Sequence, residues 1–353
     1  MISLNTNNWQ YLYGPPASSG LFKQQLADFK VQEHLGYALT GDGEHIYIEL
    51  EKAGLNTAYV AEQLANFCGL PLRQVTYAGR KDKYAVTRQW FGIHLPGKRE
   101  FNWSEFTLDG AQVVRTQRHN KKLRTGQLKG NTFIITLREV TEPEQVIERL
   151  QRAADEGVPN YFGSQRFGVQ RMSEQGEISR GGNLLLAERM INGEVIKNRN
   201  KRSMALSALR SWLFNEMLSA RISAGLLAEI QTGDVINLSG SNSIFVANDD
   251  IADLNRRLKE RDLSTTVPLW GDGGPGSSNQ PLAFEQQLAG QHPELTSFLA
   301  SQKLTQDRRA AIIWPQQLEC DRQGDTLIVR FFLPPGCFAT SVLRECINTI
   351  ELA

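Results

Sequence analysis

The sequence predicts an α+β fold with two or three domains, in keeping with its 353 residues. Segments near both ends alternate apolar and polar residues as strands do, whereas helical spacing dominates from about residue 143 until strand character returns near the end. No repeat of roughly 20 to 50 residues is visible. Strand-rich ends around a helix-rich middle therefore predict an insertion, with about the last 50 residues rejoining the first domain.

The first 140 residues supply most of the predicted strands. Alternating apolar residues predict strands over 43–50, 87–95 and 131–140. Between the first two, a helix is predicted to begin after Asn56, a good N-cap residue, and to stop at Gly69.

The rest of the chain is predicted to be mainly helical until its last strand. Helices are predicted over 143–157, 183–191 and 203–223, a strand over 325–336, and a last helix from Thr340 that includes Ile347 and Ile350. The segment 271–281, GDGGPGSSNQP, is the flexible-looking stretch of this half.

The composition is typical of an ordinary folded soluble protein, with 41% hydrophobic and 22% charged residues. No apolar run approaches the roughly 20 residues of a membrane helix, and the opening MISLNTNNWQ lacks the features of a secretory signal. Four cysteines without a C-x-x-C pair favour free thiols in a cytosolic protein. Five histidines without ligand spacing predict no metal site.

The charges nearly cancel, at a net charge of +1, but they are unevenly distributed. No acid lies between Asp109 and Glu139 or between Glu194 and Glu216, while both intervals contain several lysines and arginines. Such blocks are either solvated helix faces or a defined surface for an anionic partner, and their recurrence beside aromatic and amide residues favours the anionic partner.

A third basic stretch, AGRKDKYAVTRQW (78–90), contains a single acid, Asp82. It lies in a connection just before a predicted strand, where a rigid scaffold can hold functional side chains. Nearby positive charge keeps a carboxylate ionised and also attracts a polyanion. From these residues alone, Asp82 is either an acid of a solvated turn or a nucleophile beside a phosphate backbone.

This stretch resembles the signature of the TruD family of tRNA pseudouridine synthases, approximately A-G-x-K-D-K-x-A-x-T-x-Q. Five further segments resemble other motifs of that family, in the same order and over essentially the whole chain: LADFKVQE, LKGNTFIITLRE, GVPNYFGSQRFG, RNKRSMALSALRSWLFN and LPPGCFATSVLRE. The pair GRKDK and NYFGSQRFG makes the resemblance specific.

The resemblance implies a pseudouridine-synthase mixed-sheet catalytic core with an inserted helix-rich TRUD domain. It places the catalytic domain in residues 1–156 and 305–353 and the insertion in 157–304. The implied activity is isomerisation of uridine 13 in the D arm of tRNA, by a cytoplasmic protein expected to be a monomer. The base is both leaving group and acceptor, so no cofactor or metal is expected.

The resemblance also assigns roles to single residues. Asp82 matches the catalytic aspartate, and Lys23 matches the basic residue that pairs with it. Phe133 matches the aromatic ring that stacks on a flipped uracil, although a strand phenylalanine is commonly a core residue. Positions used around the base correspond to Phe29, Asn131 and Phe338. The Asn131 amide suits the edge of a uracil.

Basic and amide residues in the motifs and basic blocks are candidate RNA contacts. These are Arg80, Lys81, Lys83, Lys121, Lys122, Arg124, Gln165, Arg166, Arg199, Lys201 and Arg202. Position 80 varies in the family, which argues against an essential role for Arg80. Lys81 and Lys83 could equally shape the turn, and the segment 160–168 could equally organise a domain junction.

Two other classes of protein would use similar features. A tRNA-binding protein without activity would need the basic blocks but not the single acid among them. A glycosylase or a nuclease would need the carboxylate, although a metal-dependent nuclease usually has clustered acids. Release of free uracil or strand scission would identify those enzymes, whereas an isomerase leaves the mass of the RNA unchanged.

Overall fold

A computed structural model describes residues 4–6, 8–97, 99–168, 181–241 and 243–351. The chain divides into two compact units. The sheet unit comprises Pro16–Glu156, Trp314–Ala339 and Cys346–Ala353. The helix-rich unit comprises Met1–Pro15, Gly157–Ile313 and Thr340–Glu345.

The helix-rich unit includes residues 1–15, 305–313 and 340–345. The family resemblance places these segments in the catalytic domain instead. Strand pairing accounts for the second of these segments. The strand β13 (Ile312–Ile313) pairs with β8 (Val158–Pro159), so residues that follow the predicted insertion are tied to its beginning.

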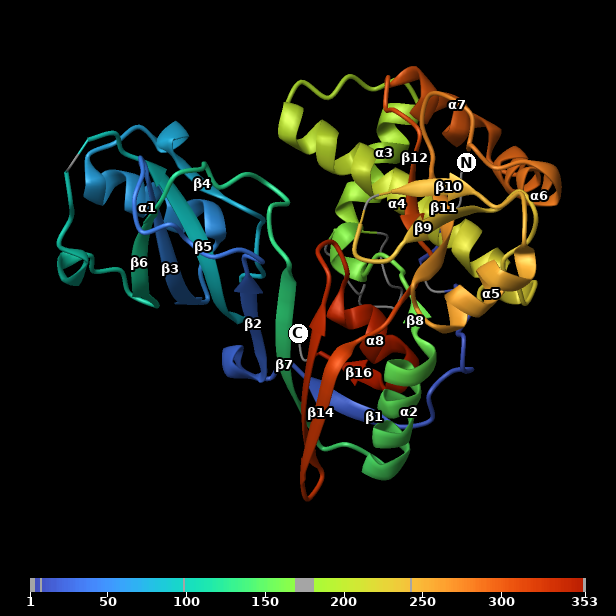
Figure 1. The fold of residues 1–353 in the computed structure, drawn as a ribbon, viewed down its shortest axis with the longest axis horizontal. Coiled ribbons are helices and arrows are strands. Elements are labelled where there is room, and N and C mark those ends of the chain that lie inside the picture. Colours follow the sequence, from blue (N-terminus) through green and yellow to red (C-terminus); the bar gives the residue numbers. More distant parts are fainter. Residues whose placement is uncertain (1–3, 7, 98, 169–180, 242, 352–353) are drawn as a thin grey trace. The chain divides into compact units, whose positions relative to one another are not determined.

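One mixed sheet runs through the sheet unit, as expected of this fold class. Its main path is β14 (Gln316–Gln323), β15 (Thr326–Leu333), β7 (Gly130–Arg138), β2 (Phe29–His34), β5 (Val86–His94), β3 (His45–Ala53) and β6 (Ala111–His119). The neighbours β2 and β5 are parallel, and the other neighbours on the path are antiparallel (Figure 1).

Three short strands extend this sheet. The strand β1 (Ser19–Phe22) pairs with β7 and also, in parallel, with β16 (Asn348–Ile350). The strand β4 (Val75–Tyr77) pairs with β5. The connection between β4 and β5 contains Asp82, and β1 leads directly into Lys23.

The helix α1 (Thr57–Cys68) covers one part of this sheet, and its predicted ends are confirmed. Asn56 is the N-cap residue, and Gly69 ends the helix in the left-handed conformation, at φ 64°. The apolar face of α1 packs on Ile48 and Phe91 of the sheet. The helix α2 (Pro143–Glu156), in the same unit, also lies where the sequence predicts it.

The helix-rich unit holds five helices wholly within its described residues. They are α3 (Gly182–Ile191), α4 (Arg199–Ser223), α5 (Ile251–Lys259), α6 (Asn279–Gly290) and α7 (Pro293–Ser301). A sheet that the sequence did not predict accompanies them, in the order β10 (Ile244–Val246), β9 (Val235–Leu238), β11 (Leu263–Leu269) and β12 (Asp307–Ala310). No helix in the described ranges is long and apolar enough to cross a membrane.

Two helix boundaries differ from the predicted ones by more than one residue. The helix α4 begins at Arg199 instead of Ser203, because the Asn198 side chain caps it by accepting a hydrogen bond from the Lys201 amide. The last helix, α8 (Ala339–Cys346), stops before Ile347, and residues 348–350 form β16 instead. Pairing with β1 takes these residues out of the helix.

Candidate active site

The carboxylate of Asp82, in the connection between β4 and β5, is held in an ion pair. Its Oδ2 lies 2.7 Å from the Lys23 ammonium, and the two side chains are only 13% and 10% exposed. Its Oδ1 accepts a hydrogen bond of 3.0 Å from the Tyr84 amide. A carboxylate with a close cation and an amide donor is stabilised in the ionised form, which is the form that can act as a nucleophile.

The backbone of Lys23 adopts a conformation that side chains other than glycine rarely take, with φ 57°. This turn directs the ammonium over the ring of Phe29, 4.4 Å from its centre, and near that of Phe22, at 5.2 Å. Such strain persists only where the surroundings hold it, and it concentrates at functional sites.

Aromatic rings of neighbouring strands pack next to this ion pair. Phe29 of β2 and Phe133 of β7 lie 6.0 Å apart between ring centres, and Phe133 lies 5.7 Å from Phe331 of β15. Both Phe29 and Phe133 are 7% exposed. Through Phe29, the rings adjoin the ammonium that holds Asp82.

Asn131 lies two residues before Phe133 on β7, opposite Glu33 of β2 and Leu333 of β15. It is 9% exposed, and its Oδ1 accepts no hydrogen bond from the described part of the chain. Phe338 is half-buried in the segment between β15 and α8.

The bases around Asp82 point in different directions. Lys81 turns inward, and its ammonium lies 2.6 Å from the buried carboxylate of Glu33, with 9% of its side chain exposed. Arg80 and Lys83 are exposed, and the Lys83 ammonium lies 5.5 Å from the centre of the Tyr84 ring. Because the Lys81 ammonium is paired with a buried carboxylate, it serves packing. The exposed side chains of Arg80 and Lys83 are the ones that can contact a polyanion directly.

A second lysine beside Asp82 was not singled out from the sequence. The ammonium of Lys52 donates hydrogen bonds to the carbonyl oxygens of Asp82, at 3.0 Å, and Leu55, at 2.7 Å. Its side chain is 1% exposed. One signal could have found it, because alternation in β3 puts Lys52 on the same face as Ile46, Ile48 and Leu50.

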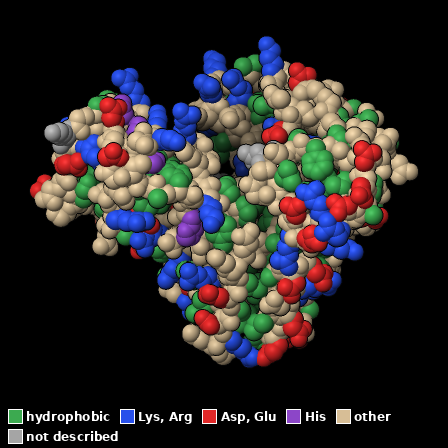
Figure 2. All heavy atoms as spheres, viewed as in Figure 1, with side chains coloured by type: hydrophobic (Ala, Val, Ile, Leu, Met, Phe, Trp, Pro, Cys, Tyr) green, Lys and Arg blue, Asp and Glu red, His purple; other side chains and the backbone are tan. Residues whose placement is uncertain are grey.

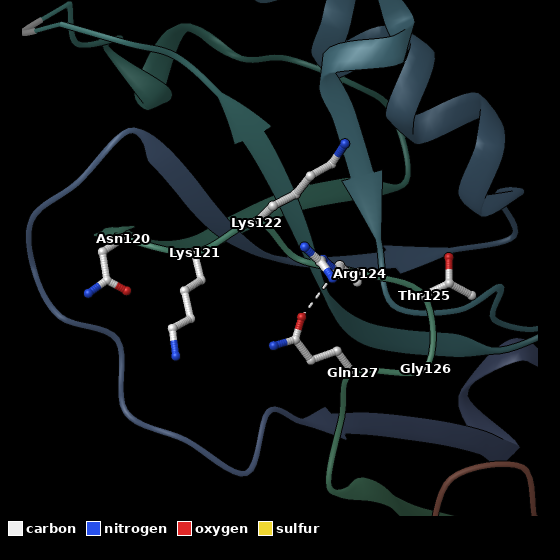
Figure 3. Close-up of a pocket in the computed structure, with 7 residues that line it drawn as sticks. All are labelled: Asn120, Lys121, Lys122, Arg124, Thr125, Gly126 and Gln127. Carbon is white, nitrogen blue, oxygen red and sulfur yellow. Dashed lines mark hydrogen bonds between the residues drawn. The ribbon is translucent and has the colours of Figure 1, made fainter.

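The basic loop after β6 carries three of the candidate RNA contacts. Lys121, Lys122 and Arg124 are exposed and line an open pocket with Asn120, Thr125, Gly126 and Gln127. Figure 3 shows the two lysine side chains projecting in different directions, while the Arg124 amide donates to Gln127 Oε1, at 3.1 Å. Figure 2 shows basic side chains over the part of the sheet unit formed by α1, β3, β5 and β6.

In the helix-rich unit, basic residues gather at the start of α4. Arg199, Lys201 and Arg202 are exposed there, and a pocket is lined by Arg199 and Arg202 together with Ser203, Leu206, Ser207, Arg210, Gln302 and Leu304. Gln165 is exposed. Arg166 is half-buried, donates to Ser207 Oγ at 3.0 Å and lies over the Phe162 ring. Burial lowers the pKa of Arg166 from its usual range.

Groups that could hold a metal ion do not occur among the residues that the structure describes. All four cysteines are free thiols, and two of them, Cys68 and Cys346, are buried.

Comparison with known proteins agrees with this fold. The chain matches the profile of the family described as tRNA pseudouridine synthase D (TruD) over residues 5–179 and 194–346. It is 53% identical over 345 residues to tRNA pseudouridine synthase D of Pseudoalteromonas atlantica, covering 98% of this chain and 97% of the relative. The corresponding protein of Colwellia psychrerythraea is 40% identical over 348 residues, covering 96% of this chain and 92% of the relative.

A solved structure from Methanosarcina mazei, described as a putative tRNA pseudouridine synthase D, superposes with a TM-score of 0.69. It is 21% identical and covers 96% of each chain, so it supports the fold alone. The sequence matches define an isomerase, a pseudouridine synthase. Within that class, the chain belongs to the TruD family, tRNA pseudouridine synthase D.

Proposed function

We propose that this protein isomerises uridine 13 in the D arm of tRNA to pseudouridine, with Asp82 as the nucleophile that acts on a flipped-out uridine. The observation that carries the proposal is the Asp82–Lys23 ion pair beside a cluster of aromatic rings. Membership of the TruD family supports the tRNA substrate.

The reaction needs few groups. The C1′–N1 bond of the uridine breaks and a C1′–C5 bond forms, while C5 loses a proton and N1 gains one, so the mass of the RNA is unchanged. The Asp82 carboxylate supplies the nucleophile that carries the separated ribose or base through the rearrangement. Every atom of the product comes from the substrate, and the proposal therefore includes no cofactor.

The neighbours of Asp82 have distinct parts in this proposal. Lys23 orients the carboxylate and keeps it ionised. Phe133 stacks on the flipped uracil, with Phe29 and Phe338 bordering the base. Asn131 reads the edge of the uracil, and its unused Oδ1 acceptor supports that role.

The rest of the tRNA would be bound through exposed cations and amides on both units. In the sheet unit these are Arg80, Lys83, Lys121, Lys122 and Arg124; in the helix-rich unit they are Gln165, Arg199, Lys201 and Arg202. We assign Lys81 and Arg166 to shaping the fold, since their cations contact Glu33 and Ser207.

Functionally, we propose that residues 1–156 and 305–353 act as the catalytic domain and that 157–304 contribute RNA contacts. We also propose that the protein works as a cytoplasmic monomer. Size-exclusion chromatography with light scattering tests the monomer, and a dimer mass would reject it.

The central test is the Asp82→Asn variant, which keeps the size of the side chain and removes its charge. We expect it to bind tRNA as the parent does and to lose turnover by several orders of magnitude, since each ~1.4 kcal/mol of lost transition-state stabilisation is tenfold in rate. Single-turnover formation of pseudouridine, mapped by carbodiimide modification of the tRNA, measures it. Asp109→Asn, an exposed acid of the same unit, is the matched control and should retain the parent rate.

Three outcomes would reject parts of this proposal. A rate for Asp82→Asn above about one hundredth of the parent rate would make Asp82 a turn residue, because a lost nucleophile costs more than that. Release of free uracil by the parent would indicate a glycosylase. Pseudouridine at a position other than 13 would reject the proposed target site while leaving the chemistry intact.

A further inference from the structure

Four buried polar side chains contact the segment that carries Asp82. Glu33 of β2, Lys52 of β3, Thr57 of α1 and Gln89 of β5 come from four different elements, and each is at most 2% exposed. Every one of them contacts residues 79–82 or a neighbour that does. Buried polar groups need satisfied partners, so this arrangement fixes a loop that could otherwise move.

Three of the four side chains, Glu33, Thr57 and Gln89, contact residues that precede Asp82. The Lys81 amide donates to Thr57 Oγ1 at 3.0 Å, and that hydroxyl donates to Gln89 Oε1 at 3.1 Å. Gln89 in turn donates to the Gly79 carbonyl at 3.5 Å. Glu33 pairs with the Lys81 ammonium at 2.6 Å and accepts from the Trp90 amide at 3.2 Å.

The fourth side chain, Lys52, reaches Asp82 itself. Its ammonium bonds the Asp82 carbonyl oxygen, whereas Lys23 bonds the carboxylate of the same residue. Lys23 thus acts on the end of the side chain and Lys52 on the main chain from which the side chain departs. A buried ammonium is expensive unless paired, and here two carbonyl oxygens and the nearby Asp82 charge offset that expense.

We propose that Lys52 is a positioning residue for the isomerisation, which fixes the main chain of Asp82 so that the carboxylate meets the reacting atoms. This inference rests on the proposed role of Asp82 as nucleophile. Lys52 itself does not touch the substrate, because both hydrogen bonds of its ammonium go to the protein backbone beneath the loop. A displacement of about 1 Å at a reacting group can lower a rate ~100-fold, which is the scale of effect that such a residue controls.

Burial gives Lys52 a property that supports this role. It lowers the pKa of Lys52 to about 8, and the Asp82 charge opposes that shift while the Lys81 charge adds to it. By reciprocity, the Lys52 ammonium favours the ionised carboxylate of Asp82. A residue that only filled space would have no such charge effect.

The test is Lys52→Met, which keeps the length of the side chain and removes its charge and donors. We expect the single-turnover rate at saturating tRNA to fall about 10- to 100-fold, with the dissociation constant for tRNA within about twofold of the parent. The acid limb of the pH–rate profile should move to higher pH, because the lost cation no longer favours the carboxylate. Lys30→Met, which changes an exposed lysine on strand β2 of the same sheet, is the matched control and should change neither the rate nor the pH profile.

A double-mutant cycle separates positioning from general destabilisation. If Lys52 and Lys23 both act through Asp82, then Lys52→Met should cost less in a Lys23→Met background than in the parent. An unchanged rate in Lys52→Met would overturn the proposal. So would a lower rate accompanied by an unshifted pH profile and fully additive effects, since that pattern belongs to a purely structural residue.

Hydrogen exchange tests the same inference without any reaction. The amides of residues 81 and 84, which bond Thr57 and Asp82, should exchange at least about tenfold faster in Lys52→Met, while those of α1 keep their parent rates. Equal exchange in parent and variant would overturn the positioning role. If the parent forms no pseudouridine, the proposed function fails, and exchange still decides whether Lys52 holds the loop.

Discussion

Asn131 combines deep burial with an unused hydrogen-bond acceptor. Leaving a buried polar atom without a partner costs about 1–3 kcal/mol in the unliganded protein. In a position that serves only the core, nothing offsets that loss of stability. In a binding site, a hydrogen bond to the bound base can offset it. Asn131 lies two residues from Phe133, the proposed stacking ring, which is consistent with the proposed contact to uracil.

This gives a prediction in which stability and activity change in opposite directions. Asn131→Leu replaces the amide with an apolar group of similar shape, so the urea midpoint should stay the same or rise. At the same time kcat/KM on tRNA should fall about 10- to 100-fold, because one or two hydrogen bonds to the base are lost. A variant that loses stability and keeps its activity would show that Asn131 serves the fold instead of the base.

Single side chains also show where sequence reasoning reaches its limit. Asp82 could be singled out because an acid among bases is visible in the sequence itself. The inward turn of Lys81 could not, because its partner Glu33 lies 48 positions earlier in the chain, on another strand. The pairing of Lys23 with Asp82 came from family resemblance, and the 2.7 Å contact agrees with it.

At the level of elements, the turn between β1 and β2 connects Lys23 to Phe29 and is held by Asp28. The Asp28 carboxylate accepts three hydrogen bonds from Arg138 of β7, one at 2.7 Å and two at 3.2 Å. It also accepts one from the main-chain amide of Gln25, at 3.1 Å, and one from its side-chain amide, at 3.3 Å. Burial raises the pKa of Asp28, but the bonds from Arg138 and Gln25 outweigh it and leave the pKa below its usual value. The ionised carboxylate is therefore part of the folded turn.

Because the pKa of Asp28 is lower in the folded state than in the unfolded state, the ionised carboxylate stabilises the fold. This contribution is fully present above the unfolded pKa of about 3.9 and is lost as the pH falls through the folded pKa. Asp28→Asn should therefore lower stability by ~1–3 kcal/mol at pH 7. The difference from the parent should shrink below about pH 4. Urea unfolding across this pH range measures it, with the exposed Asp321→Asn as control. A difference independent of pH would contradict the assigned cause.

Elements defined by local signals could be predicted, and those defined by distant partners could not. Asn56 and Gly69 bound α1, and each is a residue type common at its end of a helix, so both ends were predictable, although the Asn56 side chain makes no cap hydrogen bond. Residues 348–350 continue a helical spacing, yet they pair with β1, more than 300 positions earlier. The strand β6 was missed because it carries few apolar residues and depends on its ladder with β3.

For the whole molecule, the near-neutral net charge conceals basic surfaces on both units. Exposed lysines lie in the loop after β6 in the sheet unit, and exposed arginines lie in the first turn of α4 in the helix-rich unit. If both contact tRNA phosphates, binding should weaken linearly on a log–log plot of affinity against salt.

The prediction concerns the slope of that plot. Lys121→Gln with Lys122→Gln should reduce it by at most about two, and Arg199→Gln with Arg202→Gln by a similar amount, since each lost phosphate contact removes roughly one. The four changes together should add, while single-turnover chemistry at saturating tRNA persists. Filter binding at several salt concentrations measures the slopes. An unchanged slope in either pair would place that pair away from the RNA.

The sheet unit is assembled from segments that lie far apart in the sequence, and this order has a consequence during synthesis on the ribosome. The strand β7 can pair fully with β15 only after Leu333 has been synthesised. The strand β1 can pair with β16 only after residues 348–350 have been synthesised. Until then two strand edges remain open to unwanted pairing. Completion of the sheet therefore waits until residues 348–350 have been made, and a nascent chain carries Asp82 and Lys23 long before its sheet is complete.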